Sequence, residues 1–207
     1  MARYFLSIAL LISLLRPSLA QVQKPKTLIN FPEFSIALLD YEVGPSTQNQ
    51  LSKNTKPALH LASIPGELPE GRIITIKSTK ATITKLEGRY ETGIFVTNDG
   101  VTCDLSYWKT YSAPLKALKK TSSTSFIFPS YSREERKMFY PIDINEWKQE
   151  VKSNCGDTFY NLIKANTFVN QGASEVAICR YTLKISGKLR SNGKTFSKLI
   201  YFDIPLD

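Results

Sequence analysis

Few side chains of this sequence have the types and spacing that catalysis or metal binding requires. The 207 residues contain one histidine, His60, and three cysteines, Cys103, Cys155 and Cys179. A zinc site needs Cys and His at short, regular spacing, and these four residues are far apart. The chain also has no GxSxG, GxGxxG or P-loop motif. The sequence therefore predicts no catalytic residue, no metal site and no cofactor.

Two remaining combinations of residues would suit acid–base or nucleophilic chemistry. A dyad of His60 with one thiol is the first, but the secretory leader described below favours disulfides over free thiols. The pair Glu134 and Glu135 is the second. It lies between Arg133 and Arg136, which is typical of a solvated charged turn. We therefore expect that the protein is not an enzyme.

Residues 100–141 are the most informative stretch for binding, because basic and aromatic side chains alternate there. Such a mixture can hold a phosphate group and stack on a base. The candidate residues for binding nucleic acid or another partner are Lys109, Lys116, Lys119, Lys120, Arg133, Arg136, Lys137, Tyr107 and Trp108. The alternative is that the aromatic residues form core and the lysines are solvated, and we favour it because aromatic side chains in strands usually pack inward.

The composition agrees with a folded, basic protein. Lys and Arg number 27 against 18 Asp and Glu, which gives a formal net charge of +9. The chain is 42% hydrophobic, enough to form a core, and its length suits one domain or two small ones. A basic protein favours acidic partners or anionic surfaces.

Residues 1–20 have the pattern of a secretory signal peptide. Arg3 precedes an apolar run over residues 5–15, and small residues then predict cleavage before Gln21. The apolar run is too short to cross a bilayer as a helix. Arg3 and Arg16 are the only charged residues of the leader, so +7 of the net charge remains afterwards. We expect a secreted, extracellular protein, with translocation into host cells as a further step.

Secretion also permits disulfide bonds. Three cysteines allow one bond and leave one thiol unpaired. Cys103, Cys155 and Cys179 are all candidates, and the sequence does not choose between the pairs.

The mature chain divides into an N-terminal extension and a larger domain. Residues 21–71 form the extension, which includes a first strand over 34–43 and a polar linker over 44–57. Residues 72–207 form the domain. It starts with alternating runs at 73–78, 81–86 and 90–97, which predict a meander with a turn at Glu87-Gly88.

Further along the chain, the patterns predict short helices and more strands. Residues 112–120 read as a helix capped by Ser112, with Lys116, Lys119 and Lys120 facing solvent or a partner. Strand-like runs follow at 125–131 and 137–142.

The last third of the chain carries the strongest local signals. Asp143 fits the N-cap of a helix through Val151, and a second helix starts at 157 or 158 and stops at Gly172. Two long strands, 175–186 and 195–205, flank a hairpin turn at 191–194. The expected fold is α+β, rich in antiparallel sheet, with two or three short helices.

Segments 100–143 and 152–206 share an order of features, as in a weak internal repeat. Each has a cysteine followed by an aromatic residue, then a helix, then a strand with Tyr and Pro. In the first segment the motifs are Thr102-Cys103, Tyr107, Phe128-Pro-Ser-Tyr131 and Phe139-Tyr-Pro-Ile-Asp143.

Over residues 90–155 this order resembles the small RNase-like secreted effectors of powdery mildew fungi. The resemblance implies a fold like that of microbial guanyl-specific ribonucleases, with one helix on a curved antiparallel sheet. Two features depart from the pattern: Val101-Thr102-Cys103 replaces the aromatic-x-Cys start, and the chain is longer. No histidine follows His60, so the ribonuclease acid has no counterpart in the matching region.

Together these features predict a secreted, non-enzymatic effector of virulence type that binds a host protein or RNA. One alternative is an extracellular β-rich binding or inhibitor module. Another is a secreted hydrolase of unrecognised type.

Overall fold

The computed structural model describes residues 25–39, 41–45, 58–63 and 68–204. Within these ranges the chain is a β-rich α+β protein with two sheets, one long helix and a 3-10 turn, as the coarse fold class predicted. The predicted leader, residues 1–20, lies outside the described residues, and so does most of the predicted linker.

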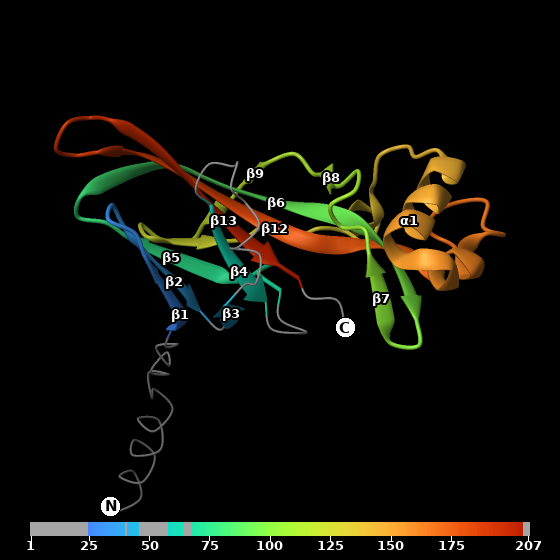
Figure 1. Cartoon of the computed structure of the whole chain (residues 1–207). Coiled ribbons are helices and arrows are strands. Elements are labelled where there is room, and N and C mark those ends of the chain that lie inside the picture. The colour runs from blue at the N-terminus through green and yellow to red at the C-terminus, as the bar shows by residue number, and fades with distance from the viewer. Residues whose placement is uncertain (1–24, 40, 46–57, 64–67, 205–207) are drawn as a thin grey trace, which may run out of the picture.

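The larger sheet has eight strands, and its longest, β6 (Ala81–Asn98) and β12 (Ser174–Leu189), run along the length of the molecule (Figure 1). Its order is β3-β4-β13-β12-β6-β7, with the short β8 and β9 also paired to β6. All pairs are antiparallel except β13 with β4. The strands are β3 (Val43–Pro45), β4 (Leu59–Ser63), β6 (Ala81–Asn98), β7 (Val101–Asp104), β8 (Tyr111–Ser112), β9 (Lys116–Ala117), β12 (Ser174–Leu189) and β13 (Thr195–Asp203). The hairpin predicted at 191–194 joins β12 and β13.

The smaller sheet has five antiparallel strands in the order β1-β2-β5-β11-β10. Its strands are β1 (Pro25–Asn30), β2 (Ser35–Leu39), β5 (Ile73–Lys77), β10 (Lys119–Lys120) and β11 (Ser125–Ile127). Two segments of the predicted N-terminal extension therefore share a sheet with strands from residues 72–207.

The main hydrophobic core lies between the two sheets. Alternation along each strand turns one set of side chains inward, such as Ile36 and Leu38 on β2 and Ile74 and Ile76 on β5. The long strands contribute Tyr90, Leu86, Tyr181, Leu183, Ile185, Ile200 and Phe202 from the other side. The opposite face of β6, β12 and β13 is left for polar side chains.

A second core lies under helix α1 (Ile144–Ile163), at the far end of the long strands (Figure 1). Trp147, Val151 and Ile163 of the helix are buried with Ile94 and Val96 of β6. The helix end of the molecule thus has its own apolar cluster on the same sheet.

The predicted N-cap of α1 is confirmed, because the Asp143 carboxylate accepts hydrogen bonds from the Asn145 and Glu146 amides at 2.9 Å. The two helices predicted after it form one element with a kink at Gly156, whose φ is +84°. A left-handed residue of this kind favours glycine. The predicted stop at Gly172 is wrong, since the helix ends at Ile163.

The predicted helix over 112–120 is wrong, because this segment contains the strands β8, β9 and β10. Its backbone bonds to neighbouring strands instead of to itself: the Leu118 amide donates to the Leu86 carbonyl at 3.0 Å. Leu118 is buried between exposed lysines, so the apolar residues follow a strand pattern that the capping signal of Ser112 obscures.

The predicted turn at Glu87-Gly88 is also wrong, because β6 runs straight through it. A side chain on Gly88 would meet the ring of Phe128 at 2.9 Å, so this glycine permits a close approach and not a turn. The predicted strand 137–142 is wrong too. Its first residue ends a 3-10 turn, η2 (Glu135–Lys137), and the remainder has no regular structure.

Candidate functional site

The structure places the predicted binding residues in two groups. Lys116, Lys119 and Lys120 lie on β9 and β10, and an ion pair of Lys116 with Glu135 brings η2 beside them. We call this group the basic edge, and its members are Lys116, Lys119, Lys120, Arg133, Arg136 and Lys137. The second group is Tyr107, Trp108 and Lys109, which lies in the loop between β7 and β8.

Carboxylates hold two members of the basic edge. Lys116 Nζ lies 2.5 Å from Glu135 Oε1, and this hydrogen bond is the main reason why the pKa of Glu135 is lowered. Arg136 Nη2 lies 2.6 Å from Glu70 Oε2. In the described part of the chain, the other four cations are exposed and have no ion pair: Lys119, Lys120, Arg133 and Lys137.

The aromatic residues of the stretch mostly serve the core, as favoured from the sequence. Phe128 and Tyr131 are buried in the main cluster. Tyr107 and Tyr140 are exposed instead, at 63% and 48%, and Arg180 lies 5.9 Å from the ring centre of Tyr107. Lys109 lies 5.1 Å from the ring centre of Trp108 and pairs with Glu146 of α1 at 2.5 Å.

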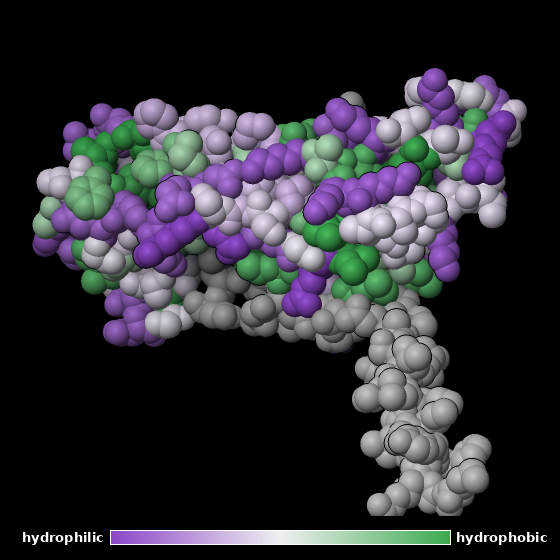
Figure 2. Space-filling model, turned by 180° about the vertical axis from the view of Figure 1, so that it is seen from behind, coloured by the Kyte–Doolittle hydropathy of each residue, from purple (hydrophilic) through white to green (hydrophobic). Residues whose placement is uncertain are grey.

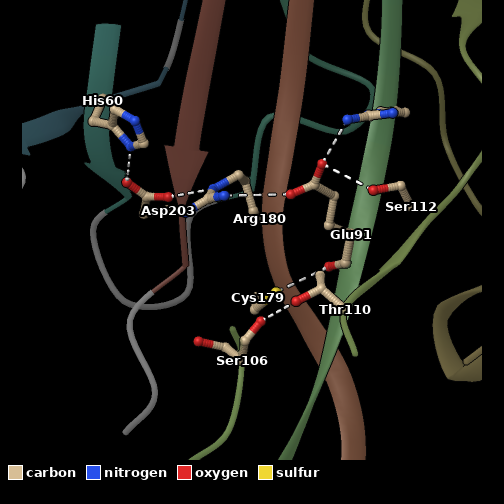
Figure 3. A network of polar contacts seen from close by, with 9 residues as sticks. His60, Glu91, Ser106, Thr110, Ser112, Cys179, Arg180 and Asp203 are labelled. Carbon is tan, nitrogen blue, oxygen red and sulfur yellow. Dashed lines mark hydrogen bonds and ion pairs between the residues drawn. The ribbon is translucent and has the colours of Figure 1, made fainter. Parts of the chain in front are cut away.

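A chain of charged side chains crosses the polar face of the larger sheet (Figure 3). His60 Nδ1 lies 3.0 Å from Asp203 Oδ2, and the other oxygen of Asp203 accepts from Arg180 Nε at 2.6 Å. Arg180 Nη1 reaches Glu91 Oε2 at 3.4 Å, and Glu91 Oε1 accepts from Arg89 Nη2 at 2.8 Å. We call these five residues the polar network.

Strand register assembles the polar network from distant parts of the sequence. Arg180 on β12 lies opposite Glu91 on β6 and opposite Asp203 on β13. The parallel pairing of β4 then adds His60 beside Tyr201. Sequence reasoning missed this set because, apart from Arg89 and Glu91 on β6, its members lie far apart in the chain. The one sequence signal that could have indicated the network is the alternation of charged residues with core residues along β6, β12 and β13.

Next to the network lies the unpaired cysteine, Cys179. Its thiol donates to the Glu91 carbonyl oxygen at 3.4 Å. Burial, reinforced by the charge of Glu91, raises the pKa of the thiol to about 12. A thiol that stays protonated near neutral pH is a poor nucleophile, and His60 pairs with Asp203. This environment does not suit a Cys–His dyad.

The space beside the network is small. A cavity of about 40 Å³ adjoins Tyr107, Cys179, Arg180 and Asp203. That volume suits a few water molecules and not a substrate. Burial disfavours the charged form of Arg180, but its bonds to Asp203 and the charge of Glu91 outweigh this effect and raise its pKa. The network therefore links four strands, β4, β13, β12 and β6.

A much larger cleft, of about 610 Å³, opens on the same sheet. The residues that line it come from β6, β12, β13 and the segment before β9, and they are Arg89, Leu115, Thr182, Lys184, Ser186, Ser197, Lys198 and Leu199. We call it the sheet cleft. On the face seen in Figure 2, hydrophilic side chains cross the middle of the molecule and apolar ones form smaller groups among them.

Cys103 on β7 and Cys155 on α1 form a disulfide bond, with a sequence separation of 52 residues. Among the described residues, no three His, Cys, Asp or Glu side chains lie close enough to hold a metal ion. In the same part of the chain, no helix is both long enough and apolar enough to cross a membrane.

No protein-family model matches this chain, and neither a curated protein nor a solved structure is found to match it.

Proposed function

We propose that the protein is a secreted, non-enzymatic effector that binds host RNA through its basic edge. The observation that carries this proposal is the set of four exposed cations, Lys119, Lys120, Arg133 and Lys137, with no ion pair among the described residues. Cations that no carboxylate neutralises remain available to phosphate groups. The net charge of +7 that remains after removal of the leader adds a long-range attraction for polyanions.

The structure around the basic edge is well suited to hold these cations in place. Lys116 lies 4.7 Å from the ring centre of buried Tyr131, and the Glu135 carboxylate that binds Lys116 also accepts from the Ser132 amide at 2.8 Å. Arg136 is anchored on Glu70, whose carboxylate also accepts from the Tyr181 hydroxyl. The anchored pairs fix the backbone, and the unpaired cations project from it.

We also propose that residues 90–155 form a ribonuclease-like core. In support, α1 packs on the ends of β6 and β7 and is tied to β7 by a disulfide. The additional five-stranded sheet lies outside that pattern. The proposal that the protein is not an enzyme rests on the contact of His60 with Asp203 and on the raised pKa of the Cys179 thiol.

The experiment is an RNA-binding titration of the secreted chain at several salt concentrations. A labelled single-stranded RNA of about 20 nucleotides is followed by fluorescence anisotropy. We expect Lys119→Glu with Lys120→Glu to weaken binding about tenfold or more. The double variant should also lower the slope of log K against log salt by about 0.7 for each phosphate that the protein no longer neutralises.

The matched control reverses two charges at the helix end of the molecule, Lys152→Glu on α1 and Lys164→Glu at its C-cap. This helix lies at the opposite end of the molecule from β5 (Figure 1), and β11 joins β5 to β10. We expect the control to change affinity less than about threefold, since it changes the net charge by the same amount and leaves the basic edge intact. Equal losses in both double variants, or no RNA binding at all, would reject the proposal. Binding to an acidic host protein in place of RNA would favour the protein-target alternative.

A further inference from the structure

The sheet cleft has the features of an anion site that is separate from the basic edge. We propose that it binds a tetrahedral oxyanion of the phosphate type, held by Arg89, Thr182 and Lys184. The group would be a free phosphate or a phosphate carried by a sugar or an oligonucleotide.

Strand register brings the donors of the cleft to one face. Arg89 on β6 lies opposite Thr182 on β12, and Ser186 on β12 lies opposite Ser197 on β13. Lys184 stands between Thr182 and Ser186 on the same strand, on the same face. One guanidinium, two ammonium groups and three hydroxyls therefore line a cleft of about 610 Å³. This volume is in the range of small-molecule sites.

Two of these donors are buried without a partner. Thr182 is 2% exposed, and neither its Oγ1 nor Arg89 Nε has a hydrogen-bond partner in the described structure. A buried polar group without a partner is costly and is rare in native proteins. Both groups can donate a hydrogen bond. A ligand that accepts several hydrogen bonds at once would satisfy both, and an oxyanion is such a ligand.

The charges around the cleft also favour an anion. Lys184 has no ion pair among the described residues, and no acidic residue is among those that line the cleft. Two carboxylates lie beside the cleft and both have cationic partners: Glu87, opposite Lys184 in register, is held by Lys85 at 2.7 Å, and Glu91 is held by Arg89 at 2.8 Å. Lys198 contributes little charge, since its Nζ lies 3.3 Å from Glu33.

The apolar lining limits the kind of ligand. Leu115 and Leu199 supply the apolar contacts, and the described lining includes no aromatic ring. Stacking on a base needs such a ring. The cleft is therefore suited to a phosphate and the sugar next to it, whereas the basic edge is suited to a strand backbone.

The test is calorimetric titration of the secreted chain at constant ionic strength with three probes: inorganic phosphate, glucose 6-phosphate and a uridine trinucleotide. We expect Thr182→Val and Lys184→Gln each to weaken binding of the tightest probe about tenfold, because each removes a hydrogen bond to a charged group. The matched control is Lys188→Gln, an exposed lysine on the same strand outside the cleft lining, and it should change affinity less than about twofold.

Each outcome decides the proposal. If no probe binds, or if Lys188→Gln weakens binding as much as the cleft variants do, the cleft is not an oxyanion site. The tightest of the three probes identifies the carrier of the phosphate. The variant Lys119→Glu with Lys120→Glu should keep its phosphate affinity within about threefold, so failure of this site and failure of RNA binding at the basic edge are separable.

Discussion

The polar face of the eight-stranded sheet has two regions that differ in how their buried polar groups are paired. In the polar network, Glu91 and Asp203 are each paired with arginine. In the sheet cleft, only a few residues away along the same strands, Thr182 Oγ1 and Arg89 Nε are buried and unpaired. Arg89 belongs to both regions, because its Nη2 serves Glu91 while its Nε has no partner.

The difference separates stability from binding capacity. The part of the network around Arg180, where arginine and carboxylates engage one another, holds strands in register and is not suited to a ligand. Unpaired donors in a cleft lower the stability of the free protein, and a bound acceptor would restore that stability. The same sheet thus carries a structural site and a candidate ligand site side by side.

The largest expected effect comes from breaking the network at its centre. Arg180→Met leaves Glu91 and Asp203 without their shared partner, and we expect the free energy of unfolding to fall by about 3 kcal/mol. Urea unfolding at neutral pH measures it. A loss below about 1 kcal/mol would mean that the carboxylates find water or other partners and that the network is not structural.

Two buried threonines provide the next contrast. Thr182→Val removes a hydroxyl without a partner, and we expect a gain of about 1 kcal/mol in the free energy of unfolding. Thr92→Val removes a hydroxyl that donates to the Met138 carbonyl at 2.5 Å, and we expect a loss of about 1 kcal/mol. Both are measured by urea unfolding without added anion. Losses of similar size in the two variants would show that Thr182 already has a partner in solution.

Alkaline pH tests the network through Cys179. The pKa of its thiol is raised from 9.0 to about 12 in the folded protein, so its contribution is complete below pH 9.0 and is lost as pH rises toward 12. Between about pH 9 and pH 10 we expect the wild type to lose about 1 kcal/mol more than Cys179→Ala. Buried tyrosines such as Tyr90, with a pKa of about 12, add losses at higher pH. Parallel pH profiles of the two proteins would refute the buried-thiol assignment.

The smallest effect is expected in the cleft. Lys184→Gln removes a charge that has no ion pair among the described residues, and we expect the free energy of unfolding to change by less than about 0.5 kcal/mol. The same measurement serves as the control for Arg180→Met, since both change one cation on β12. A large loss would place Lys184 in the structural network and would weaken the case for a ligand there.

Local signals explain what the sequence predicted well. The turn at 191–194 and the cap at Asp143 depend on residues within one turn of the chain, and both are confirmed. The core role of Phe128 and Tyr131 followed from the usual inward packing of strand aromatics. In these cases the residues that decide the structure are neighbours.

The errors arise where tertiary contacts outweigh local signals. Gly88 resembles a turn residue, but it lies within a continuous strand. The ring of Phe128 packs so close to it that there is no room for a side chain. Ser112 and the leucines after it resemble a capped helix, but hydrogen bonds to β6 draw that segment into the sheet. The polar network was out of reach for the same reason, because a shift of one residue in register would separate Arg180 from both its carboxylates.

The length of β6 and β12 couples the two ends of the molecule. Residues Leu86 and Tyr90 of β6 belong to the core between the sheets, whereas Ile94 and Val96 belong to the core under α1. Neither core can melt without exposing part of a strand that the other one buries. The described chain should therefore lose its structure in a single cooperative transition, and an anion bound in the sheet cleft would also protect amides of the distant helix from hydrogen exchange.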